Sequence, residues 1–145
     1  MDDLNRAQVF KWTLVFIGWL IATLSTLGAL FLGEVMGYTP CVLCWYQRIA
    51  MFPLVLILFT GLFPFDPRVV RYALPLAASG WLLAVFHVAL VAGWIPENIK
   101  PCQQGVPCSD AQVVWFGFVT IPLLSVMAFS TVVGLLLATL RKDEK

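Results

Sequence analysis

Four long stretches without a charged residue alternate along this chain with short polar segments. The first, residues 12–33, has 22 residues, which as an α-helix extend about 33 Å and match a hydrocarbon core of about 30 Å. The second charge-free stretch starts after Arg48, but Thr39 and Pro40 are typical of a helix N-cap and first position. We therefore expect the second helix to begin near residue 40.

The third stretch, residues 72–96, contains the only histidine, His87. The fourth, residues 111–140, has 30 residues and is too long for one perpendicular crossing, so its first residues, up to Trp115, are expected to be interfacial. The N-terminal apolar stretch exceeds the usual 7–15 residues of a signal peptide, which predicts an uncleaved first span. The predicted spans are approximately residues 12–33, 40–64, 72–96 and 115–140.

The composition agrees with this pattern. Hydrophobic residues make up 61% of the 145 positions and charged residues 12%, against roughly 45–50% and about 25% in soluble domains. A soluble fold of this size could not bury so much apolar surface. The composition excludes a soluble enzyme and a disordered chain, and a net charge of +1 argues against nucleic acid as a partner. The prediction is one all-α domain, residues 1–145, folded as an integral membrane four-helix transmembrane bundle.

The distribution of positive charge predicts the orientation of the bundle. Seven of the nine Lys and Arg residues flank the spans on the side that carries both termini: Arg6, Lys11, Arg68, Arg71, Arg141, Lys142 and Lys145. Only Arg48 and Lys100 lie on the other side. Because cytoplasmic loops are enriched in Lys and Arg, both termini are expected in the cytoplasm. The loops at residues 34–48 and 97–110 then face outward.

All four cysteines lie in these two outward loops, where an oxidising environment allows disulfides to persist. Cys41 and Cys44 form a C-x-x-C motif in the opening turn of the predicted second helix. The partial positive charge of a helix N-terminus favours the thiolate form of such cysteines. Arg48 follows Cys44 by four residues, about 40° around the helix, and favours a stabilised thiolate at Cys44. The alternative for Arg48 is membrane anchoring.

Three interpretations of the C-x-x-C motif compete. A half zinc site is disfavoured because four outward thiolates would sooner form disulfides, and no nearby histidine supplies a mixed site. An inert structural disulfide would close a very short loop and add little stability. A redox-active dithiol is favoured by this spacing at a helix start. The second pair, Cys102 and Cys108, lies in a polar loop with Gly105 and Pro107, and by itself fits a structural or a catalytic disulfide equally well.

Three segments carry a family resemblance: P-C-V-L-C-W-Y-Q-R at 40–48, I-K-P-C-Q-Q-G-V-P-C-S at 99–109, and W-F-G-F-V-T-I-P at 115–122. Together with four spans, they resemble the DsbB family of bacterial membrane oxidases, which make disulfides using quinone. The likeness is greatest to the short-loop members, named BdbC in Gram-positive bacteria, and it covers nearly the whole chain.

The resemblance implies a quinone-dependent thiol:disulfide oxidoreductase of the bacterial cell membrane that supports oxidative protein folding. Cys41 and Cys44 would be the pair oxidised by menaquinone or ubiquinone, with Cys44 facing the quinone ring and Arg48 polarising it. Cys102 and Cys108 would take electrons from an extracytoplasmic DsbA-like thiol oxidase, and Cys102 would form the mixed disulfide. Electrons would then pass through the C-x-x-C pair into the quinone pool of the lipid membrane.

Two positions depart from the better-known members of that family. Only five residues separate Cys102 from Cys108, so a wide rearrangement of that loop is not expected. Gln47 stands where some members carry an acidic residue, which alters the charge beside Arg48.

His87 is predicted about 13 Å below the outer end of the third helix, at a depth where it and Arg48 could contact one quinone headgroup. The alternative is a neutral histidine hydrogen-bonded to a neighbouring helix. For the whole protein, the alternatives are a thiol–quinone reductase of the vitamin K epoxide reductase type, a non-catalytic membrane protein stapled by disulfides, and a metal-binding or transport protein.

Overall fold

The protein is described by a computed structural model in which residues 2–96, 114–115 and 119–141 are placed. Its elements are the helices α1 (Asp2–Leu30), α2 (Val42–Leu62), α3 (Val69–Val91) and α4 (Ile121–Arg141), the π-helical turn η1 (Phe31–Val35), and the strands β1 (Val114–Trp115) and β2 (Val119–Thr120). The two short strands pair antiparallel just before α4. All four long helices are apolar and long enough to cross a membrane. The predicted all-α four-helix membrane bundle is confirmed.

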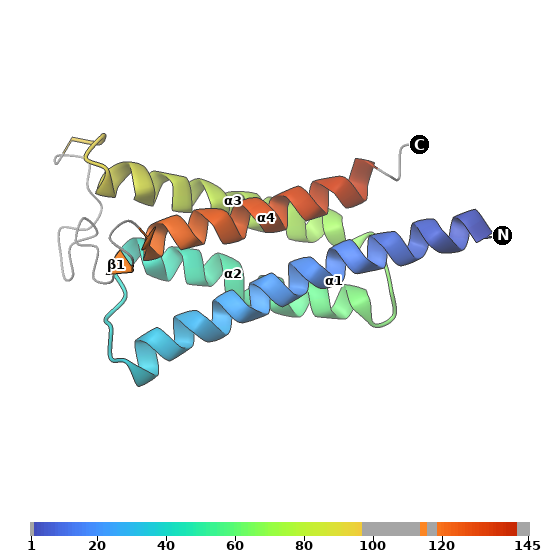
Figure 1. The fold of residues 1–145 in the computed structure, drawn as a ribbon, viewed down its shortest axis with the longest axis horizontal. Helices are drawn as coiled ribbons and strands as arrows, with labels where there is room; N and C mark the ends of the chain where they lie inside the picture. Colours follow the sequence, from blue (N-terminus) through green and yellow to red (C-terminus); the bar gives the residue numbers. More distant parts are fainter. Residues whose placement is uncertain (1, 97–113, 116–118, 142–145) are drawn as a thin grey trace.

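The helices form a closed bundle in which α1 and α3 each pack against both α2 and α4. Figure 1 shows the start of α1 and the end of α4 at one end of the bundle. The segment between α1 and α2, the end of α3 and the start of α4 lie at the other end, which we call the cysteine end because α2 begins there just after Cys41. The side of the membrane that each end faces stays a prediction.

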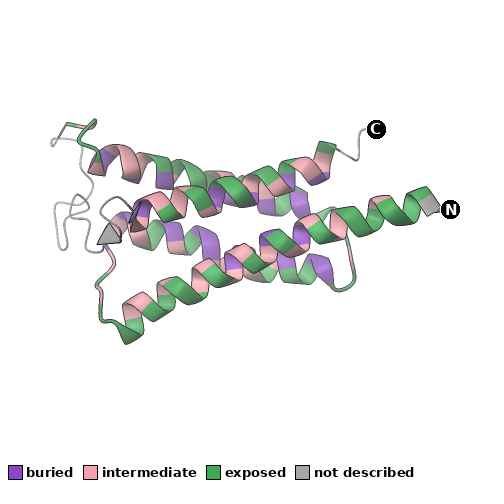
Figure 2. Cartoon of the chain, in the orientation of Figure 1, coloured by how far each residue is buried: buried purple, intermediate pink, exposed green. Residues whose placement is uncertain are grey.

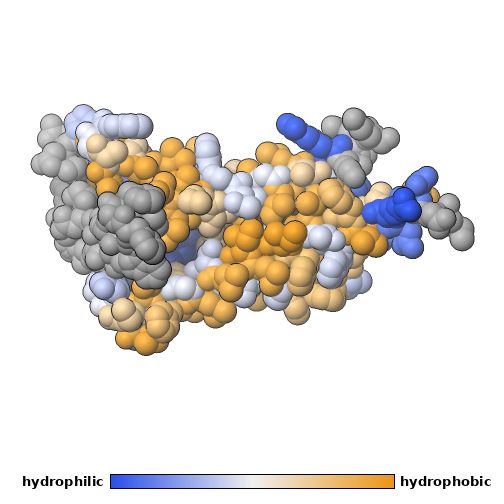
Figure 3. Space-filling model, in the orientation of Figure 1, coloured by the Kyte–Doolittle hydropathy of each residue, from blue (hydrophilic) through white to orange (hydrophobic). Residues whose placement is uncertain are grey.

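The surface of the bundle suits lipid. Buried residues line the facing sides of the helices, and exposed residues cover their outer sides (Figure 2). Many of the exposed residues are large and apolar, such as Leu24, Leu56 and Leu82. Apolar side chains cover most of the visible middle of the bundle, and polar ones gather where the two termini lie (Figure 3). This distribution is the one expected where lipid replaces water as the solvent.

A close approach between helices centres on Gly80. A Cβ atom at Gly80 of α3 would overlap the ring of Phe129 on α4 and touch the side chain of Ala50 on α2. Phe129 is one of the largest fully buried side chains. Small residues let helix backbones approach closely in membrane proteins, so Gly80 sets the spacing of α2, α3 and α4.

Helix boundaries that differ from the sequence prediction include the starts of α1, α2 and α4 and the end of α3. Cys41, not Thr39, is the N-cap of α2, and its sulfur accepts from the backbone N–H of Cys44. The last helix begins at Ile121 rather than near residue 115, because Pro122 is suited to a first helical turn, where its missing N–H costs no hydrogen bond. Helix α3 ends at Val91, before the predicted residue 96, because Gly93 has a φ of 76° and terminates it as a left-handed cap.

Candidate active site

Two cysteine sulfurs meet at the start of α2. The sulfur atoms of Cys41 and Cys44 are 3.0 Å apart, and both cysteines are free thiols. The backbone N–H of Cys44 also donates to the Cys41 sulfur over 3.4 Å, because Cys41 is the N-cap of the helix. Cys41 is buried and Cys44 is half-buried. The pair is therefore positioned to alternate between dithiol and disulfide, giving up two electrons and two protons when the sulfur–sulfur bond forms.

His87 of α3 lies beside this pair. Its Nε2 atom is 3.8 Å from the Cys41 sulfur, and its Nδ1 atom is 3.1 Å from the side-chain nitrogen of Gln47. Both His87 and Gln47 are buried. Gln47 follows Cys44 by three residues, so the two share a face of α2, and the packing of α2 on α3 brings that face against His87.

Arg48 extends from α2 toward the end of α1. Its guanidinium donates to the backbone carbonyl of Ala29 over 2.7 Å, passes close to Gly33, and lies 5.6 Å from the centre of the Trp45 ring. Ala29 comes just before the π-helical turn η1, and such wider turns are frequent at functional sites. These contacts hold a positive charge at a fixed place between α1 and α2.

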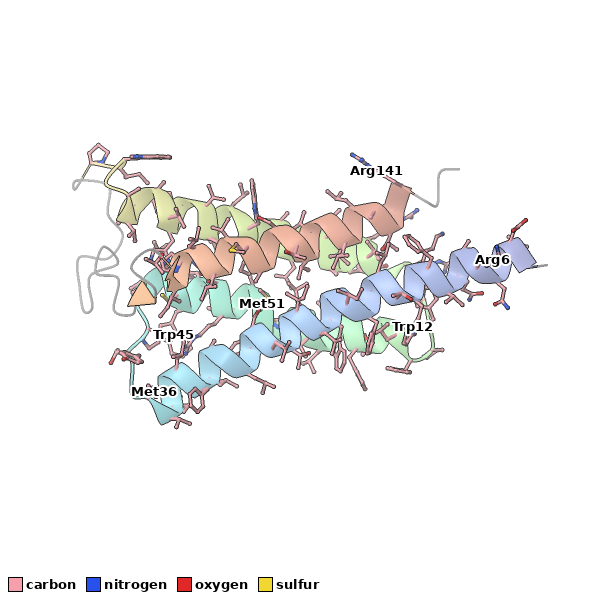
Figure 4. All side chains as sticks on the ribbon, in the orientation of Figure 1. Arg6, Trp12, Met36, Trp45, Met51 and Arg141 are labelled. Carbon is pink, nitrogen blue, oxygen red and sulfur yellow. The ribbon has the colours of Figure 1, made fainter. Side chains whose placement is uncertain are left out.

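One cavity of about 470 Å³ joins these groups. Its wall includes Cys41, Cys44, Gln47, Arg48 and His87. Apolar side chains from α1, η1, α2 and α4 complete the lining, among them Leu24, Leu32, Met51, Phe52 and Phe129. Figure 4 labels Trp45 and Met51 of α2, which flank Gln47 and Arg48 in the sequence. Figure 3 shows hydrophilic side chains at the bottom of a hollow near the cysteine end. An apolar cavity of this size with a few convergent polar groups is typical of a small-molecule site.

The electrostatics of the pair centre on Cys41, which precedes the span Val42–Leu62. The hydrogen bond with Cys44 lowers the pKa of the Cys41 thiol well below its ordinary value, and His87 lowers it further, although burial opposes the shift. The sequence placed the stabilised thiolate on Cys44 instead. The difference arises chiefly from the hydrogen bond between the two cysteine side chains, which favours the Cys41 thiolate. The backbone N–H of Cys44 points to the same sulfur, because Cys41 is the N-cap residue.

The structure brings together four of the six residues singled out from the sequence: Cys41, Cys44, Arg48 and His87. Cys102 and Cys108 lie outside the described residues. One argument against a mixed cysteine–histidine site is wrong, because His87 is distant from the motif in sequence but adjacent to it in space.

The contact between Gln47 and His87 was missed at the sequence level. The only sequence signal for it is that both are polar residues in otherwise apolar stretches, and such residues seek each other when buried.

Comparison with known proteins identifies the family. The family model "Disulfide bond formation protein DsbB" matches residues 11–139, nearly the whole chain. The chain belongs to the DsbB family. As a DsbB-family protein it is a multi-pass membrane oxidoreductase of disulfide formation, which confirms the resemblance derived from the three sequence segments.

Relatives of this DsbB-family chain cover most of its length. A probable disulfide formation protein of Metapseudomonas resinovorans is 48% identical over 90% of this chain and 91% of its own. Disulfide bond formation protein C of Bacillus subtilis (strain 168) is 43% identical over 90% of this chain and 94% of its own. Probable disulfide formation protein C 2 of Bacillus cereus (strain ATCC 10987 / NRS 248) is 44% identical over 84% of this chain and 87% of its own. No solved structure matches the chain.

Proposed function

We propose that this DsbB-family protein is a quinone-dependent thiol:disulfide oxidoreductase that reoxidises an extracytoplasmic DsbA-like thiol oxidase. Electrons pass from the reduced partner to the Cys102–Cys108 pair, then to the Cys41–Cys44 pair, and finally to membrane quinone. The observation that carries this proposal is that both sulfurs of the C-x-x-C pair, a fixed arginine and a buried histidine lie on the wall of one apolar cavity.

The cavity fits a quinone headgroup by its chemistry. A quinone is a flat apolar ring with two carbonyl oxygens that accept hydrogen bonds. The cavity offers apolar walls from three helices, and Arg48 and His87 are donors from two different helices. When bound, quinone supplies a two-electron acceptor for the dithiol. Menaquinone and ubiquinone share these features, so the proposal covers both.

Each polar group on the wall has a separate task in this proposal. Cys44, about 40° from Arg48 around α2, faces the ring. Arg48 holds a positive charge where a ring oxygen gains negative charge, and such preorganised charge is effective in a water-poor site. His87 lies near enough to the Cys41 sulfur to hold a proton that the pair releases.

The exchange steps balance without another reactant. Attack by a partner thiolate on the Cys102–Cys108 disulfide forms a mixed disulfide at Cys102 and frees the Cys108 thiolate. A second attack within the partner releases it in oxidised form and leaves the loop pair reduced. The same two steps move two electrons and two protons from the loop pair to the Cys41–Cys44 disulfide. Each attack requires a thiolate, and the leaving sulfur departs faster when it is the more acidic one.

The orientation proposed from the sequence places this chemistry outside the cytoplasm of a bacterial cell. The positive-charge bias supports it. The start of α1 and the end of α4 also lie at the end of the bundle opposite Cys41 (Figure 1). A partner that works on secreted proteins would meet the loop pair on that side.

Anaerobic mixing of the purified full-length protein with a short-chain quinone and a reduced DsbA-like partner tests the proposal. Quinone absorbance should fall by one equivalent for each partner dithiol oxidised, and the change should be lost in both Cys44→Ser and Cys102→Ser. Ser79→Ala, at an exposed position of α3, is the matched control and should behave as the parent. If quinone stays oxidised while the disulfides resist mild reductant, the protein is a disulfide-stapled bundle instead.

A further inference from the structure

Three ligand atoms for a metal ion converge at the cysteine end. The sulfurs of Cys41 and Cys44 and a ring nitrogen of His87 all lie within 4.8 Å of one another. The Cys41 sulfur is 3.0 Å from the Cys44 sulfur and 3.8 Å from Nε2 of His87. Around a tetrahedral Zn²⁺ with ordinary bond lengths, two sulfurs stand about 3.8 Å apart, and a sulfur and a nitrogen about 3.6 Å apart. The sulfur–nitrogen distance is already close to this value, and the two sulfurs would have to move apart to hold the ion.

The histidine is already oriented as a ligand. A metal-bound histidine nearly always makes a hydrogen bond through its other ring nitrogen, which fixes the tautomer and the ring plane. Gln47 provides that contact at Nδ1, so Nε2 is the atom that faces the sulfurs. The amide of Gln47 presents either its nitrogen or its oxygen when turned by half a rotation, and the oxygen accepts the Nδ1–H that a metal-bound imidazole carries.

We propose that the reduced Cys41–Cys44 pair and His87 form a binding site for a thiophilic d¹⁰ cation, such as Zn²⁺. Two thiolates and one neutral imidazole balance the charge of a divalent ion, which makes the site neutral in a low-dielectric setting where an unpaired charge is costly. All three ligand residues also line the cavity. The fourth coordination position is thus left for water or a ligand in the cavity, as in zinc sites with three protein ligands.

The site exists only in one redox state. When Cys41 and Cys44 form a disulfide, neither sulfur is a thiolate, and the two-sulfur ligand set is lost. A bound cation conversely holds the pair reduced, so metal binding and disulfide formation exclude each other. The consequence for activity, a block of turnover in the reduced state, rests on the proposed function. The binding itself does not.

Metal binding is measured on the full-length Cys102→Ser/Cys108→Ser protein, whose only thiols are the C-x-x-C pair. The protein is reduced without oxygen, freed of reductant, and titrated with Zn²⁺ alone against a chromophoric chelator. Cd²⁺ serves as a second probe, because thiolate coordination gives a charge-transfer band in the ultraviolet. We expect one Zn²⁺ per chain in the reduced protein, the Cd²⁺–thiolate band, and neither in the disulfide form.

Variants separate the mixed site from binding by the two cysteines alone. Gln47→Leu removes the contact at Nδ1 and should weaken Zn²⁺ binding about 10–100-fold, and His87→Gln should weaken it by more. Gln47→Glu keeps an acceptor beside Nδ1 and should retain the affinity. Tyr46→Phe, an exposed neighbour on the same helix, is the matched control and should bind as the parent does.

The proposal fails if the reduced protein binds no Zn²⁺, or if His87→Gln binds it as tightly as the parent. Retention of the parent affinity in Gln47→Leu with loss in Gln47→Glu would also overturn the proposed ligand geometry. The assay contains neither quinone nor partner protein, so its failure leaves the proposed electron transfer intact. Failure of quinone reduction likewise leaves the metal site intact.

Discussion

The side-chain amide of Gln47 on α2 is 3.1 Å from Nδ1 of His87 on α3. Both residues are buried in a largely apolar bundle, where an unpaired polar group costs more than it does at a wet surface. The contact therefore ties two helices together and at the same time fixes which ring nitrogen of His87 faces the Cys41 sulfur.

Removing the Gln47 partner should destabilise the bundle. In Gln47→Leu the buried Nδ1 of His87 loses its contact with Gln47, and a loss of this kind costs about 1–3 kcal/mol. The free energy of unfolding, measured by denaturant titration in mixed micelles, should fall by that amount. Tyr46→Phe, whose parent side chain is exposed, should leave it unchanged. Equal stability of Gln47→Leu and the parent would show that the contact contributes nothing.

Arg48 should govern the affinity for quinone rather than thiol exchange. Hydrogen bonds to charged groups contribute about 1.5–3 kcal/mol, so Arg48→Met should raise the KM for quinone roughly 10–100-fold. Arg48→Lys keeps the charge but loses the planar fork of donors, so its KM for quinone should lie between those of the parent and Arg48→Met. Steady-state quinone reduction measures KM, and the rate of mixed-disulfide formation with the partner should be unaffected.

The control for that series is Arg71→Met. Arg71 is an exposed cation on α3, near the end of the bundle opposite the cysteines, where α3 begins (Figure 1). Its replacement removes the same charge without touching the cavity. A KM change as large as that of Arg48→Met would mean that net charge, not position, decides the effect.

Gly80 should tolerate no side chain. In Gly80→Ala the new methyl group overlaps the Phe129 ring, and overpacking of a core costs about 1–3 kcal/mol. The melting temperature in detergent should drop. Gly134→Ala on α4 is the matched control, because a Cβ there meets nothing within 4 Å, and its melting temperature should stay the same or rise. A parent-like Gly80→Ala would show that the α3–α4 spacing adjusts freely.

The orientation of the bundle is tested by fusions to the intact chain. A fluorescent protein that folds only in the cytoplasm should fluoresce when joined after the last residue. Alkaline phosphatase, which is active only outside the cytoplasm, should be active when joined after Gly37, between α1 and α2. The opposite pattern at both positions would invert the topology and remove the cysteines from the oxidising side.

The four helices could be predicted from the sequence because their signal is local. Long apolar stretches that are separated by charged segments form helices in a membrane, where every backbone polar group must be hydrogen-bonded within the segment. The end of α3 and the start of α4 differ from the prediction, because the effects of Gly93 and Pro122 depend on backbone geometry rather than hydropathy. Arg48 and Cys44, four residues apart on one helix, line the same cavity.

The neighbours of His87 were beyond sequence reasoning, because they depend on how α3 rotates against α2. The periodicity of apolar residues shows which side of a helix is buried, but it does not show which residues of two packed helices meet. The contact with Cys41 joins residues 46 positions apart, and the sequence alone gave no reason to pair them.

The Cys41 sulfur has two roles, because it caps the N-terminus of α2 and is also one half of the reactive dithiol. A thiolate there places negative charge against the positive end of the helix dipole, an arrangement worth about 0.3–1 kcal/mol at a helix N-terminus. Oxidation removes that charge. The stability of the first turn of α2 therefore depends on the redox state of the cysteine pair. Amide hydrogen exchange at Cys44 should be slower in the reduced protein than in the oxidised one.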